Sequence, residues 1–363
     1  MQDELYMQRC IDLAQKGRGK TGLNPLVGST IVHDNRIIGE GWHKGFGKPH
    51  AEPDAISSVA EKDLPKLKDC TLYVTLEPCS HFGKTPPCTD LIIKYRIPKV
   101  VIGSVDPNPL VNGKGIAKLK AAGVKVISGV RSPETDELIK VFRTNQLYQR
   151  PYITIKFARS SDGFIGKKNA TVRISDPITD FLTHQLRTEA GGIVIGRNTS
   201  DTDQPQLTSR KFPGKNPSRL IFYSTKHPKF NDKTFDKSAP TILVGPTRLA
   251  ASPMSEGDIW LETEKTMMGT LQKIYRELKI NHLLIEGGSK LINSFLLENL
   301  WDEIFEIESA IKLYTGIAAP DLSNLKPVHS FFLKKDLVRI YQHFSSNEHG
   351  WTVGEDGSSP VQP

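Results

Sequence analysis

The sequence predicts two consecutive α/β domains, the first of them a three-layer α/β/α sandwich. Strand-like apolar runs alternate with helical patterns along both halves of the chain, which is typical of α/β folds rather than of all-α or all-β folds. In addition, the chain of 363 residues is longer than a single hydrophobic core ordinarily organises.

The first half of the chain alternates between helical and strand-like segments. Apolar residues at three- and four-residue spacing favour helices, and clusters of β-branched residues favour strands. Pro53 is compatible with a helix because it falls in the first turn, and Gly123 is typical of a helix end. We expect helices over 7–13, 50–60, 89–95 and 116–122, and strands over 27–32, 71–76, 100–102 and 124–127.

A charged helical connector over 133–149 leads to a break at Arg150-Pro151, because the residue before a proline is disfavoured in a helix. We therefore place the domain boundary near Gln146, with domains at 1–145 and 146–344. In the second domain we expect helices over 177–188, 270–278 and 290–297, and strands over 152–158, 193–195, 220–223, 241–244 and 282–285.

Composition indicates a globular protein of the cytoplasm. The N-terminus carries acids where a signal peptide needs bases, and no apolar run is long enough to span a bilayer. The net charge of +8 is spread along the chain rather than gathered in basic blocks, which argues against nucleic acid as a partner. We expect Cys10 and Cys70 to be buried reduced thiols. Residues 345–363, rich in Gly, Ser, Pro and acids, are expected to form a disordered tail with no assigned role.

The strongest chemical signal is His50-Ala51-Glu52 followed by Cys79 and Cys88. One imidazole and two thiolates suit Zn²⁺ and leave a fourth position, where zinc lowers the pKa of a water molecule enough to make it a nucleophile. Glu52 is then placed to carry protons, as in zinc-dependent nucleobase deaminases. The alternative is that the two cysteines form a disulfide or are buried thiols, but nothing indicates an oxidising compartment.

Eight residues, from Ser80 to Pro87, separate the two cysteines, where many deaminases have two. This loop carries His81 and Lys84, and a phosphate is a natural partner for both because charge-assisted hydrogen bonds to an anion are strong. A solvated loop with incidental charges is the alternative interpretation.

In the second half, Leu283 to Ser289 reads as a strand that runs into two glycines and then a helix. Such a turn lets the backbone approach a phosphate at the N-terminus of the helix. The run from Ile195 to Thr199 is a second turn of this type. Either could be a tight connection only, but two in one domain favour a nucleotide cofactor.

With these motifs in view, the chain resembles the bifunctional riboflavin-biosynthesis family, in which a pyrimidine deaminase is fused to a ribosylaminouracil reductase. The resemblance extends from the N-terminus to the neighbourhood of residue 300. It is carried by His50-Ala51-Glu52, residues 71–88, Asp106-Pro107-Asn108-Pro109, Gly113-Lys114-Gly115, residues 156–163, residues 203–210 and Glu286-Gly287-Gly288.

The resemblance implies a cytidine-deaminase-like domain followed by a dihydrofolate-reductase-like domain, with Zn²⁺ and NADPH as cofactors. It implies hydrolysis of the 2-amino group of 2,5-diamino-6-(5-phosphoribosylamino)pyrimidin-4-one, a phosphoribosylated pyrimidine, and then reduction of the ribosyl group to ribityl. A homo-oligomer is compatible with the sequence but does not follow from it.

The resemblance also implies site residues. In the deaminase, the substrate would contact Asn24, His81, Lys84, Asp106 and Asn108. In the reductase, NADPH would contact Ala158, Thr199, Asp203, Ser224, Gly288, Ser289, Lys290, Leu291, Ile292, Asn293 and Ser294. The substrate of the reductase would contact Thr171, Arg187, Leu207, Arg210 and Glu286, where the two arginines suit a phosphate. Lys156 and Asp203 are candidates for substrate polarisation and proton delivery, with structural pairing as the alternative.

The second half departs from the family pattern at several positions, which bear on cofactor affinity and substrate closure. They are Ser161, Arg173, Gln204 and Glu308-Ser309-Ala310. Two other functions stay open on the sequence alone. One is a deaminase whose degenerate second domain serves dimerisation or regulation, and the other is a deaminase of nucleic-acid bases.

Overall fold

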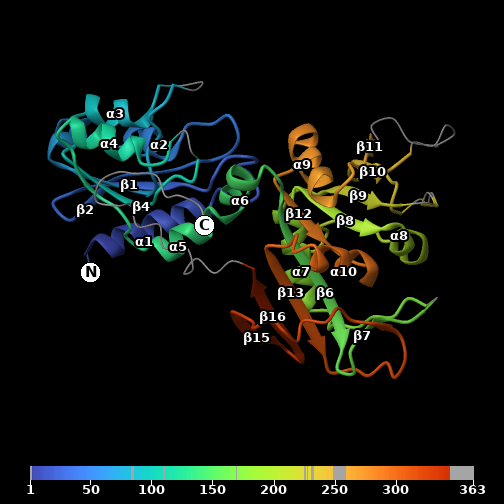
Figure 1. Ribbon diagram of the computed structural model, residues 1–363. Helices are drawn as coiled ribbons and strands as arrows, with labels where there is room; N and C mark the ends of the chain where they lie inside the picture. The colour runs from blue at the N-terminus through green and yellow to red at the C-terminus, as the bar shows by residue number, and fades with distance from the viewer. Residues whose placement is uncertain are drawn as a thin grey trace.

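The computed structural model describes residues 2–82, 86–108, 111–168, 170–224, 226, 228–229, 233–247 and 259–343. The predicted tail at 345–363 lies outside the described residues. The described chain forms a five-stranded sheet, a nine-stranded sheet and a small two-stranded ribbon (Figure 1). No helix in the described ranges has the length and apolar character needed to cross a membrane.

The first sheet has the strand order β2-β1-β3-β4-β5. β1 is antiparallel to β2 and to β3, whereas β3, β4 and β5 are parallel. The strands are β1 (Gly28–His33), β2 (Arg36–Trp42), β3 (Thr71–Leu76), β4 (Lys99–Ser104) and β5 (Lys125–Ile127). The helices of this half are α1 (Gln2–Gln15), α2 (Ala51–Ser57), α3 (Cys88–Lys94), α4 (Lys114–Ala121), α5 (Ser132–Leu138) and α6 (Lys140–Tyr148), with a 3₁₀ helix η1 (Glu61–Asp69).

Helices cover both faces of the first sheet, as predicted for a three-layer sandwich (Figure 1). On one face, Ile56 of α2, Ile92 of α3 and Leu119 of α4 pack against buried strand residues. On the other face, Met7 of α1 and Leu138 of α5 pack against a second cluster. Burying the apolar side chains of both faces stabilises the arrangement, since each contributes about 1.5 to 3 kcal/mol on removal from water.

The second sheet has the order β11-β10-β9-β8-β12-β6-β13-β16-β15 and is parallel except for β15 and β16, which are antiparallel to their neighbours. Its strands are β6 (Tyr152–Ser160), β8 (Gly192–Gly196), β9 (Ser218–Phe222), β10 (Thr241–Gly245), β11 (Ile259–Glu262), β12 (His282–Ile285), β13 (Glu303–Ser309), β15 (His329–Leu333) and β16 (Asp336–Gln342). The ribbon pairs β7 (Phe164–Gly166) with β14 (Ile317–Ala318). The helices are α7 (Thr179–Glu189), α8 (Arg197–Asp203), α9 (Met267–Leu278) and α10 (Ser289–Leu297).

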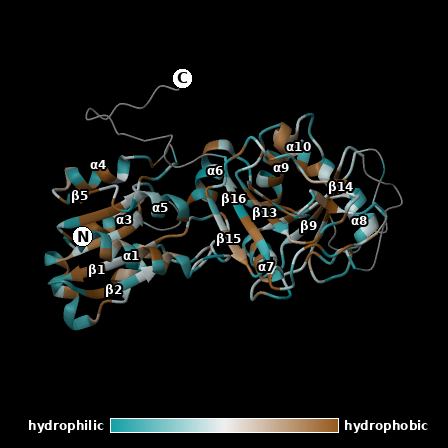
Figure 2. Cartoon of the chain, turned by 90° about the horizontal axis from the view of Figure 1, so that it is seen from below, coloured by the Kyte–Doolittle hydropathy of each residue, from teal (hydrophilic) through white to brown (hydrophobic). Residues whose placement is uncertain are grey.

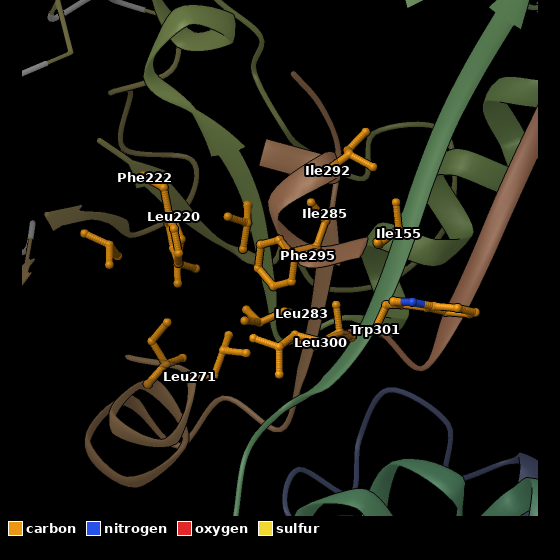
Figure 3. Packing of buried hydrophobic residues seen from close by; sticks show 14 of the residues in the cluster. Ile155, Leu220, Phe222, Leu271, Leu283, Ile285, Ile292, Phe295, Leu300 and Trp301 are labelled. Atoms are coloured by element: carbon orange, nitrogen blue, oxygen red, sulfur yellow. The ribbon is translucent and has the colours of Figure 1, made fainter. Parts of the chain in front are cut away.

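The core of the second half also lies on both faces of its sheet. Phe295 of α10 packs in a cluster with Leu220 of β9 and Leu283 of β12, and Figure 3 shows this ring among those side chains. On the opposite face, Leu186 of α7 belongs to a separate cluster. Hydrophobic residues gather along the strands inside each half, with hydrophilic residues on the loops around them (Figure 2).

Two predicted strands, Thr71–Leu76 and His282–Ile285, have the predicted bounds. The helix predicted over 50–60 is wrong in its second part, because α2 ends at Ser57 and the separate helix η1 follows. The connector predicted over 133–149 is two helices, α5 and α6, since the chain departs from helical geometry at Ile139.

β2 and β13 were not predicted from the sequence. β2 contains Gly39 and Gly41, which are unusual in strands. They are required because a Cβ on Gly41 would lie 2.2 Å from the backbone nitrogen of Ala55 in α2. β13 alternates acids with apolar residues, and its acids Glu306 and Glu308 are paired with Arg159 and Arg339 of the neighbouring strands.

Candidate active sites

Three predicted metal ligands meet at the starts of two helices in the first half. His50 immediately precedes α2, Cys88 is the first residue of α3, and Cys79 lies in the connection after β3. The Nδ1 atom of His50 lies 3.7 Å from Sγ of Cys79 and 3.4 Å from Sγ of Cys88. The possible ligand atoms of the three residues all lie within 4.8 Å of one another.

The chemistry of this donor set fits zinc. Hydrogen bonds with Cys88 and His50 lower the pKa of the Cys79 thiol, which favours the thiolate form that zinc binds. The backbone N–H of Cys88 donates to the Sγ atom of Cys79 at 3.3 Å, which stabilises a negative charge on that sulfur. All four cysteines are free thiols, so Cys79 and Cys88 are not joined as a disulfide. Cys10 and Cys70 are buried, as predicted.

Glu52 lies in the first turn of α2, two residues after His50, and only 3% of it is exposed. Burial raises the pKa of its carboxyl group to about 7. A group with a pKa near the working pH can both accept and donate a proton, which is the property that a general acid and base requires.

A cavity of about 210 Å³ is lined by Glu52 and by two of the three predicted ligands, His50 and Cys79. Four of the five residues implied for the deaminase substrate line it, namely Asn24, His81, Asp106 and Asn108. The fifth, Lys84, lies outside the described residues. Burial raises the pKa of Asp106 to about 6. The structure thus brings together side chains that are far apart in the sequence around one cavity.

Among the other residues of the cavity wall, His43, Glu77 and Phe142 were not identified as site residues from the sequence. His43 follows β2, which was itself not predicted, and Phe142 comes from α6. Glu77 stands in the run Thr75-Leu76-Glu77-Pro78-Cys79, where its place next to a metal ligand was the available signal.

In the second half, the two predicted strand–glycine–helix turns lie side by side. β8 and β12 are parallel neighbours, so the starts of α8 and α10 fall at the same sheet edge. A Cβ on Gly288 would lie 3.0 Å from Oγ1 of Thr199, and Gly287 and Gly288 have φ values of +127° and +80°. These glycines allow a close backbone approach that other residues would block, which fits the phosphates of a dinucleotide.

The other residues implied for NADPH differ in their surroundings. Ile292 is wholly buried in the core (Figure 3), and its backbone N–H donates to the carbonyl of Gly288 at 3.1 Å, so the structure exposes no part of this residue to a ligand. Asn293 and Ser289 contact each other at 3.4 Å, and Ser294 donates to the carbonyl of Leu291 at 2.7 Å. Exposed or half-buried members of the set are Ala158, Thr199, Asp203, Ser224, Lys290 and Leu291.

Arg187 and Glu286 form a bidentate ion pair with contacts of 2.8 and 2.7 Å. The guanidinium also donates to the carbonyl of Thr208 at 3.0 Å, so much of its donor capacity is used within the protein. Although burial acts to raise it, Arg187 holds the pKa of Glu286 below its ordinary value. Burial lowers the pKa of Lys156, which lies on β6. Arg210 and Thr171 are exposed, while Leu207 is buried.

The departures from the family pattern have local partners. Arg173 pairs with Asp180 at 2.9 Å, and Ser161 donates to the carbonyl of Ile311 at 3.1 Å. Gln204 adopts a left-handed conformation at the end of α8. Glu308 pairs with the two arginines described above. Arg173, Ser161 and Glu308 therefore have partners in the surrounding structure.

The fold and the zinc group define a zinc-dependent deaminase joined to a second α/β domain. Residues 1–104 match the family described as the cytidine and deoxycytidylate deaminase zinc-binding region, and residues 151–307 match the RibD C-terminal domain. The chain is 38% identical over 341 residues to the riboflavin biosynthesis protein RibD of Aquifex aeolicus, covering 93% of this chain and 95% of that protein. The chain belongs to this family of bifunctional riboflavin-biosynthesis deaminase/reductases.

Two further relatives agree. The RibD protein of Synechocystis is 39% identical over 325 residues, covering 88% of this chain and 87% of that protein. A crystal structure of a diaminohydroxyphosphoribosylaminopyrimidine deaminase/5-amino-6-(5-phosphoribosylamino)uracil reductase from Thermotoga maritima superimposes with a TM-score of 0.84 at 35% identity, covering 94% of this chain and 98% of that one.

As a member of this family, the chain is a bifunctional enzyme with deaminase and reductase activities, and it acts on pyrimidine intermediates of riboflavin biosynthesis. Its cofactors are zinc in the first half and NADPH in the second. The match through both halves disfavours the two alternatives, a deaminase of nucleic-acid bases and a deaminase with a degenerate second domain.

Proposed function

We propose that the first domain hydrolyses the 2-amino group of 2,5-diamino-6-(5-phosphoribosylamino)pyrimidin-4-one. The amino group leaves as ammonia and a water oxygen takes its place as the new carbonyl. The observation that carries this proposal is the cavity of about 210 Å³, in which Glu52, His50 and Cys79 face a wall that combines polar side chains with apolar ones. Such a wall suits a substrate with a polar ring and a sugar.

His50, Cys79 and Cys88 would hold the zinc, which supplies a water of lowered pKa as the nucleophile. Glu52 takes the proton of that water and passes it to the leaving amino group, consistent with its raised pKa. Asn24 faces the pyrimidine, while Asp106 and Asn108 bind the ribose. His81 and Lys84 bind the phosphate.

In the second domain we propose reduction of the phosphoribosylamino group of the deaminated product to the ribityl form. NADPH, when bound, would supply a hydride to C1 of the ribosyl group, and the ring oxygen that leaves C1 would take up a proton. Lys156 polarises the substrate and Asp203 delivers the proton. The substrate of the reductase contacts Thr171, Leu207 and Arg210. The Arg187–Glu286 ion pair forms part of the same site.

The two activities are assigned to units that divide near Gln146, at 1–145 and 146–344. α6 spans this division, since Phe142 lines the deaminase cavity while the side chain of Asn145 donates to the carbonyl of Asn281 at 2.9 Å. The helix therefore serves as the joint between the two active units.

The test is to incubate the purified zinc-loaded protein with the diaminopyrimidine and NADPH, and to follow ammonia and nicotinamide absorbance together. We expect ammonia first and NADPH oxidation with a lag, because the reductase acts on the deaminated product. NADPH oxidation without ammonia release would contradict this order of the two reactions. Ammonia release from cytidine at an equal rate would contradict the proposed identity of the substrate.

A further inference from the structure

The carboxylate of Glu77 is buried beside the zinc group and accepts four backbone N–H groups from the segment that follows β4. Glu77 comes directly after β3 and is 3% exposed. Its Oε2 atom accepts from the backbone nitrogens of Asp106 at 3.2 Å and Gly113 at 3.0 Å. Its Oε1 atom accepts from those of Gly115 at 2.8 Å and Ile116 at 3.1 Å.

These contacts cap the N-terminus of α4 with a side chain that is remote in the sequence. Gly115 and Ile116 lie in the first turn of α4, where backbone N–H groups have no partner within the helix and favour a negative charge. The residue that precedes this helix is Gly113, which has no side chain to offer. Glu77 supplies the missing acceptor from another element of the fold.

The tied segment carries part of the cavity wall. Asp106, Asn108 and Val111 all line the deaminase cavity. Asp106 in turn accepts the backbone N–H of Asn108 at 2.8 Å, so the position of one follows from the other. Glu77 also lies two residues before the zinc ligand Cys79, and it therefore links the ligand-bearing segment to the substrate-facing segment.

The start of α4 also packs directly against the segment of the ligand. A Cβ on Gly115 would lie 2.1 Å from the carbonyl oxygen of Pro78 and 3.1 Å from Oε1 of Glu77. Only glycine fits there without displacement, so the distance between α4 and the Pro78-Cys79 segment is set by contact. This observation is independent of the hydrogen bonds.

We propose that Glu77 is a positioning residue of the deaminase, which fixes Asp106 and Asn108 relative to the zinc group. A carboxylate offers about four lone-pair sites, and the four N–H groups occupy them, so Glu77 does not exchange protons with the substrate. The inference rests on the proposed contacts of Asp106 and Asn108 with the ribose.

The first test is Glu77→Gln, which keeps the shape but turns an NH₂ group toward two N–H donors. We expect KM for the diaminopyrimidine to rise by about tenfold, with a smaller change in kcat, because binding contacts shift while Glu52 stays in place. Zinc content and the reductase rate of the same preparation should match the parent.

The matched control is Asp336→Asn. Asp336 is also a buried carboxylate, and it accepts from the backbone nitrogen of Asp176 and from Oγ1 of Thr179, both at 2.7 Å, but it lies in the second half. Its deaminase KM should equal that of the parent. A rise there would mean that any lost buried carboxylate disturbs the deaminase, and would overturn the specific role of Glu77.

Gly115→Ala probes the same junction with Glu77 intact, and it should raise the deaminase KM in the same way. A double variant with Asn108→Ala provides the sharpest test. If Glu77 acts through Asn108, the effect of Glu77→Gln should shrink in the Asn108→Ala background, since coupled residues are not additive. If Glu77→Gln does not hold zinc, Glu77→Asp takes its place, because it keeps the charge with a shorter reach.

The outcomes separate this inference from the proposed substrate contacts. If KM of the Glu77→Gln variant equals that of the parent protein while Asn108→Ala raises KM, only the positioning role of Glu77 is overturned. If KM of the Asn108→Ala variant equals that of the parent protein, the proposed contact between Asn108 and the substrate is itself contradicted. Fully additive effects, or loss of zinc and of both activities in every Glu77 and Gly115 variant, would show that Glu77 serves the fold and not the site.

Discussion

The Nε2 atom of His43 lies 3.0 Å from the side-chain nitrogen of Asn24, while its Nδ1 atom lies 2.9 Å from the carbonyl oxygen of Pro49. Because a carbonyl can only accept, Nδ1 carries the proton and Nε2 accepts from the Asn24 amide. Burial lowers the pKa of His43, which keeps the ring neutral and this pattern intact. The amide oxygen of Asn24 is thereby turned away from His43, in a cavity that both residues line.

His43→Phe keeps a ring at this position but removes the acceptor that orients Asn24. We expect kcat/KM of the deaminase to fall by about 3- to 10-fold, the equivalent of one hydrogen bond, with zinc retained because His43 is not a ligand. Steady-state ammonia release and metal analysis measure both. His282→Phe is the control, since His282 is a buried imidazole 2.9 Å from Thr154 Oγ1 in the second half; deaminase kinetics that respond equally to both changes would contradict the role of His43.

Cys88→Ala should lower the zinc content from about one ion per chain to a small fraction, because two remaining donors hold zinc weakly. Cys70→Ala removes an equally buried free thiol outside the cluster and should leave zinc unchanged. Metal analysis after dialysis against a mild chelator distinguishes the two. Full zinc retention in Cys88→Ala would sink the ligand assignment.

Glu52→Gln keeps the shape of the side chain but removes the proton carrier. Ammonia release should fall by at least about a hundredfold, the lower range for general acid–base catalysis. Supplied with the deaminated aminouracil, the same variant should oxidise NADPH at close to the parent rate. Asp203→Asn should show the reverse pattern. Loss of both activities in a folded, zinc-loaded Glu52→Gln protein would show that the two sites are coupled.

Arg187→Gln leaves Glu286 buried without its partner, and should destabilise the second half by about 3 to 5 kcal/mol at pH 7. Both side chains of this pair are 11% exposed. Arg173→Gln breaks a more exposed pair, in which Arg173 is 53% exposed, and should cost less than about 1 kcal/mol. Urea unfolding of each variant gives the comparison.

The loss of stability caused by Arg187→Gln, measured as a free energy of unfolding, should also depend on pH. In the parent, Arg187 holds the pKa of Glu286 below its ordinary value, so the stabilisation is present above about pH 4.3 and is lost as pH falls through the folded pKa. In the variant, burial still acts to raise the pKa of Glu286, and only the weaker effects of Lys156 and His184 oppose it, so the carboxyl group becomes neutral at milder acidity than in the parent. The difference in the free energy of unfolding between the variant and the parent should therefore become smaller from pH 7 toward pH 4. A constant difference would mean that the charge of Glu286 is not the cause.

The fold class, most of the strongly patterned elements and the composition of the zinc group could be predicted from the amino-acid sequence. Thr71–Leu76 and His282–Ile285 could be predicted to the residue because a short apolar run between turn signals has few alternatives. His50, Cys79 and Cys88 could be named because three soft donors beside Glu52 are chemically specific even without coordinates.

Features that depend on contacts between residues distant in the sequence became evident only in the folded chain. β2 needs glycines because α2 packs against it, and β13 tolerates its acids because Arg159 and Arg339 lie on adjacent strands. Local pattern cannot reveal either, since the compensating partner is supplied by another element. The same holds for the cavity wall: Glu77 and His43 have roles only because β3, α4 and the segment around Asn24 converge there, and a contact between residues far apart in the chain is a property of packing rather than of any single stretch of sequence.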